Sequence, residues 1–145
     1  MLEEVNRDTT ALGGLAVFLV VTISSFLLGH ELLAKKLFFG LIICHFLTYV
    51  IRFFYFKQRP DKQSHNNVVQ KLDASSFPSL HSMRATVLAI LLSLEFQNIT
   101  LMVLFSASAL SVYLTRLILK RHYFTDVLFG AIFGLIIGIG LAFTF

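Results

Sequence analysis

The chain has few charges and lacks residues on which several classes of protein depend. Only 14% of its 145 residues are charged, tryptophan is absent, and Cys44 is the single cysteine. A lone cysteine excludes an internal disulfide and a zinc site built from cysteines. The hydrophobic fraction is 57%, whereas soluble domains average about 45–50% apolar and about 25% charged residues. The excess of apolar side chains therefore has to face lipid.

Long apolar runs organise the sequence. A helix needs about 20 apolar residues to cross a bilayer core, and one domain over residues 1–145 is the natural organisation at this length. We predict an all-α fold, a polytopic membrane helical bundle with about five transmembrane helices. The predicted spans are residues 11–29, 37–56, 79–96, 99–119 and 124–145, with loops at 30–36, 57–78 and 97–98.

Two of these boundaries rest on more than hydropathy. The opening residues MLEEVNRDTT lack the basic start of a secretory signal, so the first span is expected to be retained. The apolar pattern later runs almost unbroken from Ile99 to Phe145. One helix of that length would measure about 70 Å, more than twice the thickness of a hydrocarbon core. We therefore predict a turn at the polar run Lys120-Arg121-His122.

The basic residues lie mostly on one side of the predicted bundle. Of the 12 lysines and arginines, only Lys35 and Lys36 fall on the side away from the 57–78 loop. The positive-inside bias explains such an asymmetry, but arginines at or within the ends of apolar spans are costly and usually mark a site. Nucleic-acid binding is not expected, because the basic residues form no separate soluble patch. The arginines at span ends are Arg52, Arg59, Arg84 and Arg116.

The first polar segment contains Arg52 and Arg59, followed by Pro60. The spacing of the two arginines predicts that they share one helical face, with Pro60 ending the helix. Two guanidinium groups on one stripe can converge on a phosphate, whose oxygens they match in pairs. Arginines that reach for the interface from a helix end would give the same pattern.

The second segment covers residues 75–82. A Ser-Phe-Pro-Ser run before apolar residues predicts a helix start, where free backbone amides form a seat for an anion. Ser79 can add a hydroxyl donor, and His81 is expected to face the same pocket. A structural histidine at the membrane interface is the alternative for His81. Arg84 follows on much the same face, where it either pairs with Asp73 or assists phosphate binding.

The third segment places His122 four residues before Asp126. On a helix these side chains share a face and can form a hydrogen bond. That bond would fix the imidazole tautomer and leave the other ring nitrogen free to attack. A metal site is the competing interpretation. It lacks a convincing third protein ligand, and the nearby arginines repel cations.

Together the three segments resemble the signature of the type-2 phosphatidic acid phosphatase superfamily, which also contains vanadium-dependent haloperoxidases. The family pattern is K-x6-R-P, then P-S-G-H, then S-R-x5-H-x3-D. The matching segments here are residues 52–60, 78–81 and 115–126, in the same order and with the same internal spacing. Arg52 replaces the family lysine, Leu80 replaces glycine and Thr115 replaces serine. Many bacterial members have six spans, so this chain resembles a version without the first.

The resemblance implies an integral membrane lipid phosphate phosphatase that works through a phosphohistidine. His122 is the implied nucleophile, Asp126 orients it, and His81 protonates the leaving group and then activates water. No metal or organic cofactor is implied. The expected partners are the bilayer and a membrane lipid substrate, with no nucleic acid and no obligatory protein partner. The groups implied to hold the phosphoryl oxygens are Arg52, Arg59, Ser79, the Leu80 amide and Arg116.

The substrate, the alternatives and the membrane side stay open at this point. Phosphatidate, phosphatidylglycerophosphate, a prenyl diphosphate and a lipid A phosphate all fit. A soluble haloperoxidase does not fit five lipid-facing spans. A non-enzymatic small membrane transport or scaffold protein is the other alternative, but its intramembrane charges would not follow the spacing of the three motifs. Counting spans puts the site and the N-terminus on one side. We favour the extracytoplasmic side, as in most family members, although the basic residues lean toward the cytoplasm.

Overall fold

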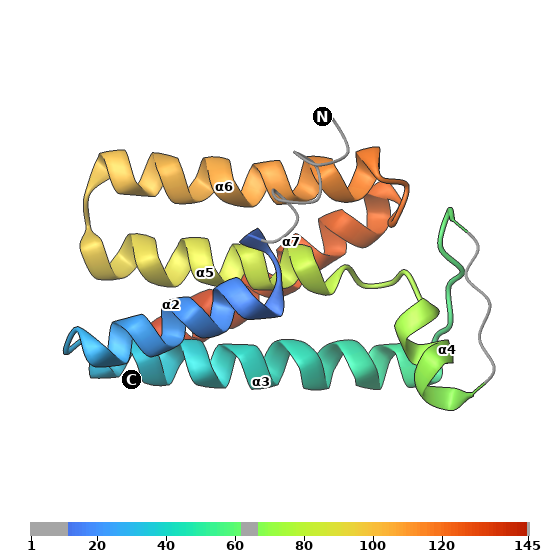
Figure 1. The fold of residues 1–145 in the computed structure, drawn as a ribbon, viewed down its shortest axis with the longest axis horizontal. Coiled ribbons are helices and arrows are strands. Elements are labelled where there is room, and N and C mark those ends of the chain that lie inside the picture. The colour runs from blue at the N-terminus through green and yellow to red at the C-terminus, as the bar shows by residue number, and fades with distance from the viewer. Residues whose placement is uncertain (1–11, 62–66, 145) are drawn as a thin grey trace.

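The computed structural model describes residues 12–61 and 67–144, and Figure 1 shows how they are arranged. Within these ranges the chain forms helices and no β-strand. The predicted all-α fold is confirmed. The helices are α2 (Leu15–Leu27), α3 (Glu31–Phe54), α4 (Val68–Ala74), α5 (Leu80–Phe96), α6 (Ile99–Ile118) and α7 (Phe124–Thr144).

The long helices coincide with predicted spans. In the described residues, α3, α6 and α7 are long and apolar enough to cross a membrane. α2 has 13 residues and α5 has 17, so both fall short of the length of about 20 that a bilayer core requires of a helix that crosses it upright. The outside of the bundle is apolar, as expected of a surface that faces lipid. Its most exposed large side chains include Leu28, Phe46, Phe54, Ile99 and Phe143.

α5 forms the centre of the bundle. It packs most extensively against α7, then against α6 and α3, and Figure 1 shows it between α3 and α6 with α7 crossing behind. Met83 and Val87 of α5 join one apolar core with Phe18 of α2, Leu37 of α3 and Leu141 of α7. The helix that carries the second polar segment is therefore held from several sides.

Glycines bring the backbone of α7 against that of α5. A Cβ atom on Gly130 would lie 2.5 Å from the carbonyl oxygen of Ser79, and one on Gly134 would lie 2.5 Å from that of Met83. Larger residues do not fit there, and small residues are the usual means by which membrane helices approach closely. The contact at Gly130 places the start of α7 beside the start of α5, which joins two of the predicted polar segments.

α3 differs from its predicted bounds at both ends. It begins at Glu31, so most of the expected 30–36 loop is helical, because the sequence ELLAKK consists of good helix formers. It ends at Phe54, well before Pro60, and Tyr55 is extended with φ −134° and ψ 100°. The predicted helical face shared by Arg52 and Arg59 is therefore wrong.

The remaining connections follow the prediction more closely. The long loop holds the short helix α4, which was not predicted and is capped by the Asn67 side chain accepting from Gln70 N–H at 2.8 Å. The predicted turn before α7 is confirmed, and Lys120 has a φ of 53°, a left-handed conformation common where helices end. The first predicted span is reduced to α2, and residues 1–11 lie outside the described part of the chain.

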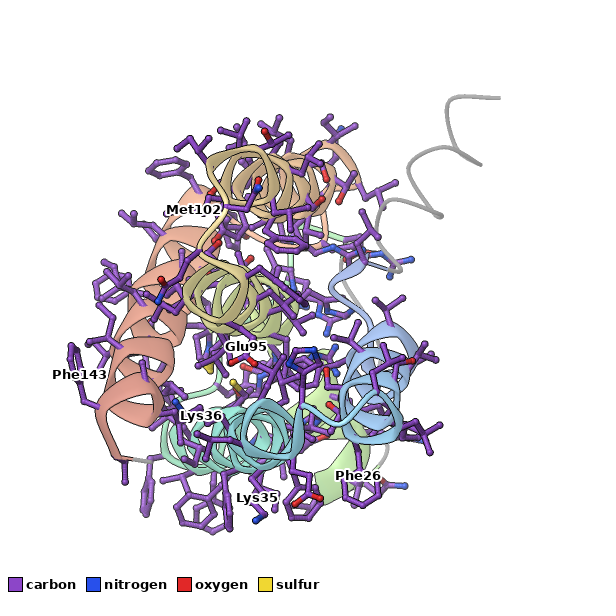
Figure 2. All side chains as sticks on the ribbon, turned by 90° about the vertical axis from the view of Figure 1, so that its left-hand side faces the viewer. Phe26, Lys35, Lys36, Glu95, Met102 and Phe143 are labelled. Atoms are coloured by element: carbon purple, nitrogen blue, oxygen red, sulfur yellow. The ribbon has the colours of Figure 1, made fainter. Side chains whose placement is uncertain are left out.

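The end of the bundle away from α4 carries charges at its surface. Figure 2 looks onto this end, where Lys35, Lys36 and Glu95 are labelled. His30 Nδ1 lies 2.7 Å from Glu95 Oε1, and Lys36 Nζ donates to the carbonyl oxygen of Ala142 in the last turn of α7 at 3.3 Å. These charges have partners or contact with solvent, which is the ordinary state of a charged side chain.

Candidate active site

Three segments that are distant in sequence meet at the α4 end of the bundle. They are the end of α3 with the residues after it, the start of α5, and the connection from α6 to α7 (Figure 1). Charge interactions link His122 to Arg52, Arg59 and Asp126, and link His81 to Arg116. The structure thus gathers the predicted site residues, which are Arg52, Arg59, Ser79, Leu80, His81, Arg116, His122 and Asp126.

Arg52 lies in the last turn of α3 and is 6% exposed. Its Nη1 donates to the carbonyl oxygen of Leu72 and its Nη2 to that of Pro78, both at 3.1 Å. The Arg52 guanidinium therefore connects the end of α3 to α4, through Leu72, and to the start of α5, through Pro78. This fork also accounts for an arginine at a family lysine position, because an ammonium is a point charge without two fixed donor directions.

Arg59 reaches the site from extended backbone. Gln58 forms an isolated antiparallel bridge with Ser75, which directs the next residue toward the second segment. Arg59 Nη2 then donates to the carbonyl oxygen of Asp73 at 2.6 Å. Burial lowers the pKa of Arg59 below its ordinary value, and the nearby Asp61 carboxylate opposes that shift.

The start of α5 offers unpaired backbone donors. Ser79 is the N-cap: its hydroxyl accepts from Ser82 N–H at 3.4 Å, and Ser82 Oγ donates to it at 2.8 Å. The amides of Leu80 and His81 have no hydrogen-bond partner within the described residues. Leu80 has ordinary helical geometry as the first residue of α5, so the position where the family has glycine requires no positive φ. Unpaired amides of this kind are what the predicted anion seat requires.

His122 is held by a backbone carbonyl in the α6–α7 connection. It is 5% exposed, and its Nδ1 lies 2.7 Å from the carbonyl oxygen of Ser76. A carbonyl only accepts, so Nδ1 carries the proton and Nε2 keeps its lone pair. Burial, followed by the positive charge of Arg59, lowers the pKa of His122 to about 3. The imidazole is therefore neutral and nucleophilic near pH 7.

Asp126 is fully buried in the first turn of α7 but is not hydrogen-bonded to His122. Its Oδ2 lies 3.9 Å from His122 Nδ1, beyond hydrogen-bonding range. Oδ2 accepts instead from Tyr123 N–H at 2.9 Å. The predicted direct hydrogen bond is therefore wrong, because α7 begins only at Phe124 and the Ser76 carbonyl already occupies Nδ1.

Lys57 is a site residue that the sequence did not reveal. Its Nζ lies 2.5 Å from Asp126 Oδ1 and 3.0 Å from Thr125 Oγ1. The same ammonium sits over the ring of Tyr123, 4.6 Å from the centroid, an arrangement that a cation favours. Lys57 lies in the unspecified interval between Arg52 and Arg59, so no spacing rule in the sequence singles it out.

Two further arginines of the pocket are buried with an unpaired Nε atom. Arg84 and Arg116 are 4% and 6% exposed, and the Nε atoms of both have no partner within the described residues. The buried carboxylate of the pocket, Asp126, already pairs with Lys57. Among the described residues, no group of three or more His, Cys, Asp or Glu side chains could hold a metal ion. Guanidinium groups with free donors are side chains that suit phosphate oxygens.

The family model described as the PAP2 superfamily matches residues 33–144. The match covers well over half of the chain and includes all three signature segments. The chain belongs to the PAP2 superfamily. This is the type-2 phosphatidic acid phosphatase superfamily that the three motifs predicted.

Solved structures share the PAP2 fold of this chain. The crystal structure of LpxE from Aquifex aeolicus has a TM-score of 0.82 at 22% identity, covering 97% of this chain and 85% of that chain. The crystal structure of the first transmembrane PAP2-type phosphatidylglycerolphosphate phosphatase from Bacillus subtilis has a TM-score of 0.77 at 24% identity, covering 97% of this chain and 75% of that one. Both likenesses concern the fold. No curated protein sequence matches the chain.

Proposed function

We propose that this PAP2 protein is an integral membrane lipid phosphate phosphatase that forms a phosphohistidine on His122. The observation that carries the proposal is a buried, neutral imidazole with a fixed tautomer, set beside the guanidinium groups of Arg52 and Arg59. The fold shared with LpxE and with a phosphatidylglycerolphosphate phosphatase supports the same class of reaction.

The first chemical step is attack by His122 Nε2 on phosphorus. The bond between phosphorus and Nε2 forms as the bond to the leaving oxygen breaks, and His81 gives a proton to that oxygen. Arg52, Arg59 and Arg116 stabilise the charge on the phosphoryl oxygens, together with Ser79 and the Leu80 amide. A water molecule then gives a proton to His81 and attacks phosphorus, which releases inorganic phosphate and restores His122.

Asp126 acts on this step through charge. The Ser76 carbonyl already holds the proton on Nδ1, so the carboxylate is not needed to choose the tautomer. It lies 3.9 Å away, where it stabilises the positive charge that the imidazole gains on attack. Lys57 holds the carboxylate in place through the ion pair.

An apolar groove beside the site suits a lipid tail. A cavity of about 210 Å³ lies between α2, α5 and α6, with Val21, Leu88 and Phe105 among its lining residues. Val112 lines this cavity and packs against Gly13. Gly13 in turn lies close to His81, because a Cβ atom added to Gly13 would be 3.0 Å from the His81 carbonyl oxygen. With the phosphate of the lipid bound at the site, its acyl or prenyl chain would lie along this groove. Phosphatidate, phosphatidylglycerophosphate, prenyl diphosphates and lipid A phosphates all have this form.

The direct test is phosphate release by the purified protein from a panel of these four lipid classes. The His122→Ala variant should lose activity at least about a thousandfold, because the nucleophile is gone. His30→Ala is the matched control, since His30 lies at the other end of the bundle. Near-normal turnover by His122→Ala would contradict the mechanism.

Metal independence is a separate test. In this proposal, guanidinium groups stabilise the phosphoryl charge in place of a metal ion. Activity should therefore survive excess EDTA. Vanadate should inhibit, because it imitates the five-coordinate phosphoryl state. Complete loss of activity with EDTA and recovery with a divalent ion would favour metal catalysis.

We also propose that the site faces the extracytoplasmic side. Lys35 and Lys36 at the other end would then be the cytoplasmic anchor. A cysteine at exposed Val68, in a Cys44→Ala background, should react with an impermeant thiol reagent on intact cells, whereas one at Gln97 should not. The reverse labelling would place the site in the cytoplasm. Residues 1–11, expected on the same side, lie outside the described part of the chain.

A further inference from the structure

Arg84 is a buried charge that the proposed mechanism does not use. It lies one turn into α5 from His81 and is 4% exposed. No hydrogen bond or ion pair of its side chain is found within the described residues, and its Nε is among the buried atoms without a partner. Leaving a guanidinium unpaired inside a membrane bundle is costly.

Three ordinary explanations for a buried arginine fail here. Asp73, the partner expected from the sequence, uses Oδ1 to accept from the Tyr49 hydroxyl at 3.3 Å and forms no ion pair with Arg84. A snorkelling arginine places its guanidinium in water, which 4% exposure excludes. A structural clamp makes hydrogen bonds, as Arg52 does to two carbonyl oxygens, whereas Arg84 makes none within the described residues.

The surroundings of Arg84 place it on the inner side of the pocket. It is close enough to His81 and Arg116 for charge interaction, and close enough to Cys44 and Tyr49 on α3. α5 starts at the site and leads toward the other end of the bundle, so Arg84 lies deeper than His81 (Figure 1). A separation of three residues puts it on much the same face as His81.

We infer that Arg84 binds a second phosphate group on the leaving-group side of the reaction, so that the preferred substrate is a lipid diphosphate. The inference rests on the proposed function, because it takes His122 as the nucleophile and His81 as the group that meets the leaving oxygen. In-line attack puts the leaving group opposite His122, and the inference takes this to be the side of His81 and Arg84.

The chemistry of the two substrate classes differs at Arg84. With a diphosphate, His122 attacks the terminal phosphorus, the bridging P–O bond breaks, and the leaving group is a lipid monophosphate whose negative charge faces the guanidinium. Water then frees inorganic phosphate from His122. With a monoester, the leaving group becomes a neutral alcohol once His81 has protonated it, and Arg84 has no anion to bind. The unpaired Nε atoms of Arg84 and Arg116 also suit the more highly charged diphosphate.

The test compares kcat/KM for farnesyl diphosphate and farnesyl phosphate. The protein should prefer the diphosphate, and Arg84→Met should lower the ratio of the two values about ten- to a hundredfold, as expected for one lost charge-assisted hydrogen bond. Arg84→Lys should restore part of the ratio. Arg121→Met is the matched control, because the Arg121 side chain is 43% exposed and pairs with Asp61 at 2.8 Å. An equal loss on both substrates, or no preference in the unchanged protein, would overturn the inference.

A binding measurement separates this inference from the proposed function. Methylene diphosphonate should raise the melting temperature of the protein more than inorganic phosphate does, and Arg84→Met should remove the difference. If no lipid is hydrolysed but this difference is found, the proposed function fails and the diphosphate subsite stands. If the difference is absent, the subsite fails. Without ligand, Arg84→Met should melt no lower than the unchanged protein, since an unpaired buried charge is removed; a marked drop would show a structural role instead.

Discussion

Charged side chains are exposed and paired at one end of the bundle and buried at the other. At the end shown in Figure 2, His30 pairs with Glu95 and the side chains are 41% and 30% exposed. At the other end, Arg52, Arg84 and Arg116 are at most 6% exposed, and the Nε atom of each lacks a partner within the described residues. Surface charges cost little because water solvates them, whereas buried ones have to be compensated. This contrast supports the proposal that the site end receives an anion.

The largest effect that sharpens this contrast is expected at Arg52. Arg52→Ala removes a proposed phosphate ligand and both hydrogen bonds to Leu72 and Pro78, so activity should fall by about a hundredfold or more. Arg52→Lys keeps the charge and should retain appreciable activity. Lys36→Ala, at the other end, should leave turnover within about twofold. Equal small effects of both Arg52 variants in a phosphate-release assay would show that Arg52 is not part of the site.

A second effect concerns the ion pair between Lys57 and Asp126, which lies next to His122. Lys57→Met leaves Asp126 buried without its partner, so the melting temperature should drop by several degrees. Adding Asp126→Asn in the same chain should recover much of that loss, because the uncompensated charge is gone. Additive losses in the double variant, measured by thermal unfolding in detergent, would mean that the two residues do not interact.

Acid should weaken the protein through His122. The pKa of His122 is lowered to about 3 in the folded state, against about 6.5 in an unfolded chain. The unfolded state therefore binds the proton first, and the stability contributed by the neutral imidazole is lost as the pH falls from about 6.5 toward 3. The melting temperature should decline over this range, and less steeply in His122→Gln. Identical slopes for the two proteins would contradict a neutral buried His122.

The smallest effect is expected at the opposite end. Glu95→Gln breaks the contact with His30, yet an exposed ion pair contributes at most about 1 kcal/mol. Melting temperature and turnover should both stay close to those of the unchanged protein. A loss as large as that of Lys57→Met would remove the difference between the two ends.

Hydropathy and spacing were enough to predict the helical bundle and the meeting of three segments. The turn at Lys120 could be predicted because one helix through it would be too long for a bilayer. The end of α3 at Phe54 could not, since the apolar run FFYF continues past it without a breaking residue. The chain is extended after that point and forms a bridge between Gln58 and Ser75, a tertiary contact that local sequence does not indicate.

The finer geometry of the site depends on backbone atoms and on contacts distant in sequence. The carbonyl oxygen of Ser76 that fixes His122 is independent of residue type, so no motif can indicate it. Lys57 meets Asp126 across 69 positions of sequence. The spacing of His122 and Asp126 correctly suggested proximity, but their hydrogen bond was inferred from a helix that begins only after His122.

The central claim is that His122 carries the phosphoryl group during turnover. The most direct measurement is to stop the reaction in alkali, which preserves a P–N bond, and to locate the phosphoryl group by mass spectrometry of the digested protein. The account predicts phosphate on His122, absent from His122→Ala and present in His30→Ala. A phosphoryl group on any other residue, or turnover with none on His122, would contradict it.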